Sequence, residues 1–200
     1  MGKIEWAVAS RPIPGQTQSG DLHLVAPRPE GVLLAVIDGL GHGPEAAMAA
    51  HEAVSVLACA PADDIIELMR RCDVAIKHTR GAVMNVAAIS YDDDSLTWGG
   101  IGNVNGIVYR SDPNAKPPQQ RLAPRPGIIG SGIARPASEN VPIFEDDVLV
   151  FATDGLASIL FDKFEPGRLE PAESMATRMI DECWTHRDDV LVLVACYGGG

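Results

Sequence analysis

The sequence predicts an α+β fold, a four-layer α/β/β/α sandwich in which two antiparallel sheets pack face to face and helices flank them. The first observation is that residues 32–37, 148–153 and 190–195 are continuous apolar runs, which are typical of strands buried on both faces. The second is the order of the elements: strands, two helices, a long run of strands, one or two helices and a last strand. Because this is not the strict alternation of a parallel βαβ fold, strands adjacent in sequence over residues 83–153 are expected to pair antiparallel.

The length bounds the number of domains. A chain of 200 residues with 46% hydrophobic residues is the size of one domain with a substantial core. We therefore expect a single domain over residues 1–197 and a glycine tail at residues 198–200.

Local patterns place the remaining elements. Apolar residues recur at helical spacing over residues 65–76, behind Asp63 and Asp64 as candidate N-caps, and again within a helix expected at residues 171–186. A third, Ala-rich helix is expected at residues 44–59, with Pro in its first turn. Weaker strands are expected at residues 4–9, 22–26, 83–91, 95–98, 104–110, 119–122 and 141–144, with a hairpin loop at 111–118 and a longer surface loop at 123–136.

Charge and cysteine usage restrict the partners and the compartment. The 16 Lys and Arg stand against 27 Asp and Glu, which gives a formal net charge of −11. A chain this acidic is repelled by a phosphate backbone, so we expect no nucleic-acid partner. We also expect no membrane segment and no signal peptide, because the apolar runs are too short. The four cysteines, Cys59, Cys72, Cys183 and Cys196, form no CxxC, and we expect reduced, mostly buried thiols in a cytoplasmic protein. We also expect the protein to be a monomer.

Acidic residues mark the ends of the buried strands. One apolar run ends at Asp38-Gly39, a second ends at Asp154-Gly155, and the third begins after Asp188-Asp189. If the last strand runs antiparallel to the other two, these carboxylates converge at one rim of a sheet. Clustered carboxylates repel one another unless a cation or a shared proton relieves them, and an all-oxygen set fits Mg²⁺ or Mn²⁺ better than Zn²⁺.

Two other interpretations of these motifs stay open. Asp-Gly is a common turn dipeptide, so each motif alone is also explained by a turn. The glycine-rich residues 38–44 could instead form a phosphate cradle before a helix, although they lack the Lys-Ser/Thr of a P-loop and the GxGxxG spacing.

At this point the sequence resembles a known family, the PPM (PP2C-type) serine/threonine phosphatases, and most of all its SpoIIE-type bacterial branch. Residues 34–43 (LAVIDGLGHG) resemble the metal motif of the family, and residues 19–21 (SGD) resemble its early Gly-Asp. Residues 100–103 (GIGN), 127–156 (ending EDDVLVFATDGL) and 187–190 (RDDV) resemble the later motifs in the same order. As a short, lone domain the chain resembles the feedback phosphatase of the stressosome. The resemblance covers nearly the whole chain and implies the PPM phosphatase fold.

The resemblance also implies a role for each motif residue. Asp38 would bridge two Mn²⁺ or Mg²⁺ ions, with the Gly39 carbonyl on one of them, Asp154 and Asp188 would complete the other, and Asp21 would lie in the outer shell. A metal-activated water would then attack phosphorus without a covalent phosphoenzyme. Two positions depart from eukaryotic-type members. Those members have a His directly after the Asp-Gly, whereas this chain has Leu40, so the nearby His42 is a candidate for proton transfer. They also have a phosphate-binding Arg shortly before the early acidic motif, whereas the nearest upstream Arg here is Arg11.

The function that the resemblance implies is the dephosphorylation of phosphoserine or phosphothreonine on a bacterial signalling protein. The expected partners are phosphorylated STAS-domain proteins of a stressosome-like complex or an anti-sigma pathway. Discrimination between phosphoproteins must come from the surface around the site, so the 123–136 loop, with Arg125 and Arg135, is a candidate docking element or a solvated connector. A catalytically silent PPM-like binding module and a nucleotide-binding protein that uses the glycine-rich loop remain alternatives.

Overall fold

The computed structural model describes residues 3–157, 163–167 and 170–198. Of the expected glycine tail at residues 198–200, only Gly198 falls within the described residues. The helices are α1 (Pro44–Cys59), α2 (Ile65–Ala75) and α3 (Ala172–Cys183). The strands are β1 (Ile4–Arg11), β2 (Asp21–Arg28), β3 (Gly31–Gly39), β4 (Ala82–Ser90), β5 (Ser95–Ile101), β6 (Asn105–Tyr109), β7 (Gln119–Arg121), β8 (Glu139–Pro142), β9 (Val148–Ala152) and β10 (Val190–Tyr197).

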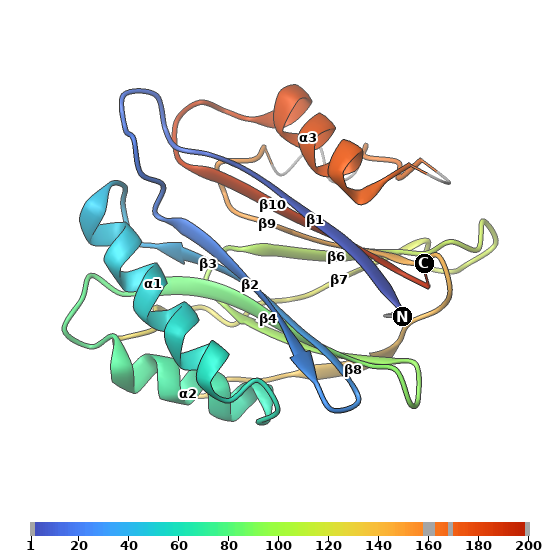
Figure 1. Ribbon diagram of the computed structural model, residues 1–200, viewed down its shortest axis with the longest axis horizontal. Coiled ribbons are helices and arrows are strands. Elements are labelled where there is room, and N and C mark those ends of the chain that lie inside the picture. Colours follow the sequence, from blue (N-terminus) through green and yellow to red (C-terminus); the bar gives the residue numbers. More distant parts are fainter. Residues whose placement is uncertain (1–2, 158–162, 168–169, 199–200) are drawn as a thin grey trace.

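Two antiparallel sheets form the centre of the molecule. One has the strand order β1-β10-β9-β6-β7 and the other has the order β2-β3-β4-β5-β8. Figure 1 shows α3 on the outer face of the first sheet, and α1 and α2 on the outer face of the second. The predicted four-layer α/β/β/α sandwich is therefore confirmed.

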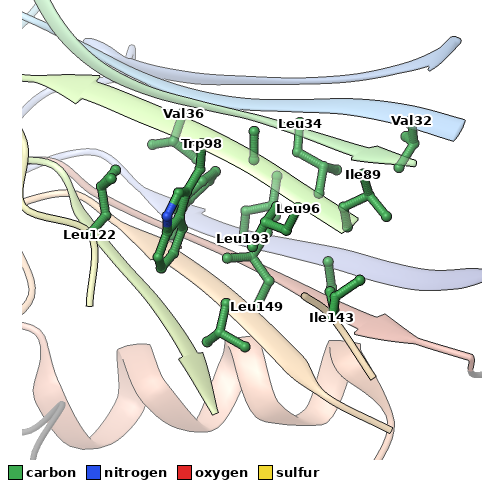
Figure 2. Packing of buried hydrophobic residues seen from close by; sticks show 14 of the residues in the cluster. Val32, Leu34, Val36, Ile89, Leu96, Trp98, Leu122, Ile143, Leu149 and Leu193 are labelled. Carbon is green, nitrogen blue, oxygen red and sulfur yellow. The ribbon is translucent and has the colours of Figure 1, made fainter. Parts of the chain in front are cut away.

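Buried apolar side chains form three clusters, one between the two sheets and one between each sheet and its helices. The cluster between the two sheets includes Leu34, Trp98, Leu149 and Leu193, which point toward one another in Figure 2. A second cluster joins the second sheet to α1 and α2, and a third joins the first sheet to α3. Because β3, β9 and β10 contribute to clusters on both of their faces, their sequences are continuous apolar runs rather than alternating ones.

The helices begin largely where the sequence predicts. The Asp64 carboxylate accepts hydrogen bonds from the N–H groups of Ile66 and Glu67 and so caps α2, while Asp63 lies one residue before the cap. α1 has Pro44 in its first turn and turns small alanines toward β2 and β3. α3 ends at Cys183, three residues before the predicted end, because Trp184 takes an extended conformation.

The predicted pairing over residues 83–153 is correct only in part. β4 pairs with β5, and β6 pairs with β7 across the predicted 111–118 hairpin loop, but β5 and β6 lie in different sheets. The chain crosses between the sheets at Gly102, whose φ of +98° favours glycine. The buried Asn85 side chain donates to the Val104 carbonyl (2.8 Å) and holds this crossover. β8 likewise pairs with β5, and β9 with β6 and β10, rather than with each other.

The 123–136 loop is anchored to the body of the protein rather than simply solvated. Its Ile129 is fully buried and pairs with Ala82 at the start of β4. The buried Asp73 carboxylate of α2 accepts hydrogen bonds from three backbone N–H groups of the loop, those of Gly130, Gly132 and Ile133. Arg125 and Arg135 are exposed.

The four cysteines are free thiols: Cys72 and Cys183 are buried, Cys196 is half-buried and Cys59 is exposed. Among the helices of the described residues, none combines the length and the apolar character that crossing a membrane requires.

Candidate metal centre

Four of the predicted acidic residues come together from the strand ends of both sheets. β2 begins at Asp21 and β3 ends at Asp38-Gly39, and Asp21 and Asp38 are directly paired residues. In the other sheet, Asp154 follows the end of β9 and Asp188 precedes the start of β10, and these two strands pair antiparallel. The other three carboxylates lie close enough to the Asp38 carboxyl for their charges to act on it. We call Asp21, Asp38, Asp154 and Asp188 the acidic cluster.

The prediction of a single sheet rim is wrong in one respect. β3 belongs to one sheet, whereas β9 and β10 belong to the other. The carboxylates therefore meet at an edge that the two sheets share.

Asp189 differs from its neighbour Asp188. It is 2% exposed, and its two carboxylate oxygens accept hydrogen bonds from the backbone N–H groups of Ile13 and Gly20, each at 2.6 Å. These bonds fix residues 12–20, the loop between β1 and β2 that leads into Asp21. The Asp188 carboxylate instead accepts a local hydrogen bond from the Asp189 N–H (2.9 Å) and stays partly exposed.

Thr153 orients Asp21 across the gap between the sheets. Its hydroxyl donates to a carboxylate oxygen of Asp21 (2.7 Å) and accepts from the Leu191 N–H (2.9 Å). Because both groups are buried, the hydroxyl fixes the direction in which the Asp21 carboxylate points. Thr153 was not among the residues predicted from the sequence. The feature that could have identified it is a hydroxyl side chain at the end of a buried strand, directly before Asp154-Gly155.

Asn103 plays a similar part for Asp154. The Asn103 side chain donates to an Asp154 carboxylate oxygen (2.7 Å) from the crossover that follows β5. From the sequence, residues 100–103 are predicted only as a motif of the family, and no role is predicted for Asn103.

Burial and mutual repulsion disfavour the charged forms of the acidic cluster. Burial, with the charges of Asp21 and Asp154 next, raises the pKa of Asp38 to about 9. Burial raises the pKa of Asp21 to about 7, although the hydrogen bond from Thr153 opposes the rise. Burial and the charge of Asp188 raise the pKa of Asp154. A divalent cation would offset these effects by neutralising the clustered charge.

The glycine loop, residues 39–43, connects β3 to α1. A Cβ at Gly39 would lie 2.0 Å from the Ala46 carbonyl oxygen, so only glycine allows α1 to pack this close to the end of β3. His42 lies on the exposed part of this loop. The candidate proton donor is thus near the chain segment that carries Asp38, and it is open to solvent.

The residues present fit a hard divalent cation that keeps some of its water ligands. Every candidate ligand is a carboxylate or carbonyl oxygen, as Mg²⁺ and Mn²⁺ prefer. Within the described part of the chain, no group of three or more His, Cys, Asp and Glu side chains is placed to hold an ion by itself. Mg²⁺ commonly binds through one or two carboxylates and keeps several waters, so the donor set agrees with this mode.

Comparisons with known proteins identify the family. The family described as stage II sporulation protein E (SpoIIE) matches residues 28–197. Phosphoserine phosphatase RsbX of Bacillus subtilis (strain 168) is 26% identical over 95 residues, which is 48% of this chain and 48% of the relative. The match thus spans about half the length of that curated relative.

Solved structures share the fold. A structure from work on the bacterial stressosome, as a modular system adapted to control secondary messenger signaling, has a TM-score of 0.86 at 24% identity and covers 96% of this chain and 98% of its own. RsbX in complex with magnesium has a TM-score of 0.84 at 19% identity and covers 97% of this chain and 95% of its own. Since the family match covers most of the sequence and these structures share its fold, the chain belongs to the SpoIIE family, the branch of the PPM phosphatases that its motifs resemble.

Proposed function

We propose that this chain is a metal-dependent protein serine/threonine phosphatase. The observation that carries the proposal is the convergence of Asp21, Asp38, Asp154 and Asp188 at the shared edge of the two sheets. Keeping four carboxylates together in partial burial is costly for the folded protein, and a function that binds cations accounts for that cost.

The proposed centre holds two Mg²⁺ or Mn²⁺ ions. Asp38 would bridge them, the Gly39 carbonyl would bind one, and Asp154 and Asp188 would bind the other. Asp21, directed by Thr153, would hold water molecules in the outer shell. Asn103 would keep the Asp154 carboxylate in position.

The chemistry divides between the ions and the chain. Such ions, when bound, activate a water molecule as a nucleophile and offset the charge of a phosphoryl group. The chain aligns the carboxylates through Thr153 and Asn103. His42, exposed on the glycine loop, is our candidate for giving a proton to the leaving serine or threonine oxygen.

We extend the proposal to the substrate and the compartment. The substrate is a phosphorylated STAS-domain protein of a stressosome-like complex or an anti-sigma pathway, and the chain acts on it as a monomer in the cytoplasm. The similarity to the phosphoserine phosphatase RsbX and to the stressosome-related structure supports this choice. The docking candidate Arg125 lies near the proposed centre, because its backbone N–H donates to the Gly100 carbonyl and its carbonyl accepts from the Gly102 N–H, next to Asn103.

The test is incubation with phosphorylated STAS-domain proteins, with and without Mn²⁺, alongside an aryl phosphate. Release of phosphate that requires the metal supports the proposal. Metal binding without hydrolysis of either substrate would instead identify a silent binding module. Stabilisation by ATP without phosphatase activity would identify a nucleotide-binding protein.

A further inference from the structure

The acidic cluster creates an electrostatic problem for a phosphorylated substrate. A phosphate monoester is an anion, and it must approach a site built from carboxylates on a chain with a net charge of −11. Two bound divalent cations would offset the four carboxylates of the cluster but would leave the chain as a whole negative. A fixed positive group near the cluster would therefore favour binding of the phosphoryl group.

Arg80 lies against the loop that directly follows Asp38, and it is our candidate for that group. The β3–β4 pairing continues past the strand ends: Gly39 is opposite Ala82, and the Leu40 N–H donates to the Gly81 carbonyl (3.0 Å). Arg80 therefore lies opposite Gly41, in the middle of the glycine loop. A guanidinium nitrogen of Arg80 is 3.0 Å from the position that a Cβ on Gly41 would occupy.

Two features hold the Arg80 guanidinium beside the loop. Gly41 has a φ of +87° and no side chain, so the guanidinium can lie against the loop backbone. Glu45, in the first turn of α1, forms an ion pair with it. The Arg80 side chain is nevertheless 51% exposed, and a guanidinium has five N–H donors, so donors remain for a second anion.

We propose that Arg80 binds the phosphoryl group of the substrate, with its guanidinium donating to phosphoryl oxygens above the glycine loop. This inference rests on the proposed phosphatase function and adds a substrate-binding residue to it. Arginine suits this role because its planar fork pairs with two phosphate oxygens at once, whereas lysine offers a single point charge. Glu45 competes with the phosphate for the same guanidinium and keeps it near the loop in the free protein.

Binding of inorganic phosphate to the Mg²⁺-loaded protein, measured by calorimetry, tests the proposal directly. Arg80→Ala should raise the Kd for phosphate by about tenfold or more, since it removes charge-assisted hydrogen bonds, and Arg80→Lys should have an intermediate Kd. Glu45→Gln should bind phosphate at least as tightly as the wild type. The matched control is Arg71→Ala, because Arg71 forms a similarly exposed ion pair with Asp63 within the α2 region.

Two results would overturn the role of Arg80. One is a phosphate Kd of Arg80→Ala equal to that of the wild type. The other is an equal weakening in Glu45→Gln, which would show that the ion pair supports the loop and that the guanidinium does not bind phosphate. Circular dichroism confirms that each variant is folded.

Aryl phosphate turnover separates this inference from the proposed function. Metal-dependent turnover with an unchanged KM in Arg80→Ala contradicts the inference and leaves the phosphatase function standing. Phosphate binding that depends on Arg80, in a protein that hydrolyses neither substrate, supports the binding site and contradicts the function.

Discussion

Replacing Asp189 by Asn should destabilise the protein through two specific hydrogen bonds. The Asp189 carboxylate is buried, and each of its oxygens accepts a backbone N–H, one from Ile13 and one from Gly20, at 2.6 Å. An Asn side chain keeps one acceptor oxygen and turns an NH₂ group toward the other backbone N–H. One bond is therefore replaced by a contact between two donors.

The structure sets the size of the effect. A hydrogen bond to a charged group contributes about 1.5–3 kcal/mol, and a buried donor left unsatisfied has a similar cost. The lost negative charge also relieves repulsion on Asp21, which offsets part of the loss. We expect a net loss of about 2 kcal/mol in the free energy of unfolding, which for a domain of this size lowers Tm by about 4–8 °C.

Thermal and urea denaturation of the metal-free protein measure this loss, and Asp188→Asn is the matched control one residue away. The Asp188 carboxylate accepts only the adjacent Asp189 N–H among the hydrogen bonds to described residues. Burial raises the pKa values of Asp21, Asp38 and Asp154, and the charge of Asp188 adds to each rise. Asp188→Asn should therefore melt at or above the wild-type Tm while it weakens metal binding. An unchanged Tm in Asp189→Asn, or a larger loss in Asp188→Asn, would refute the division of roles between the two residues.

Three further predictions concern the metal centre and its surroundings. Asp38→Asn should nearly abolish Mn²⁺-dependent hydrolysis of an aryl phosphate with an unchanged circular dichroism spectrum, and activity within a few-fold of the wild type would contradict its bridging role. Mn²⁺ should raise Tm and a chelator should reverse the rise, since free metal at about 100 times its Kd adds roughly 2.7 kcal/mol; a Tm indifferent to both would leave the cluster without a cation. Charge reversal at Arg125 and Arg135 should slow dephosphorylation of a protein substrate and spare an aryl phosphate, whereas equal effects on both substrates, or on neither, would count against docking by the 123–136 loop.

The apolar pattern predicts the elements because burial governs them locally. The runs at residues 32–37, 148–153 and 190–195 became β3, β9 and β10, each covered on both faces. Asp64 could be identified as a candidate cap because an N-cap needs a side-chain acceptor at the start of an apolar periodic stretch. These features depend on residues a few positions apart.

Sheet membership could not be predicted in the same way. A strand buried on both faces has the same pattern in either sheet, so nothing in β5 or β6 indicates that the chain crosses between sheets at Gly102. The roles of Asp188 and Asp189 could not be separated by physical reasoning either. Their difference arises from the N–H groups of Ile13 and Gly20, which are more than 160 positions away.

Two polar contacts orient the acidic cluster and also join the two sheets. They lie at the strand ends where the carboxylates of the cluster repel one another. Thr153 on one sheet donates to Asp21 on the other, and Asp189 accepts from Gly20, directly before Asp21. Burial, and after it the charges of the neighbouring carboxylates, raises the pKa values of Asp21 and Asp38. The repulsion between these charges pushes the strand ends apart, whereas the two contacts hold them together before a cation arrives. The free energy that keeps the strand ends together without metal thus comes partly from residues that bind no metal. It follows that Thr153 and Asp189 support the centre by preorganising it, and that losing either contact would weaken metal binding as well as the fold.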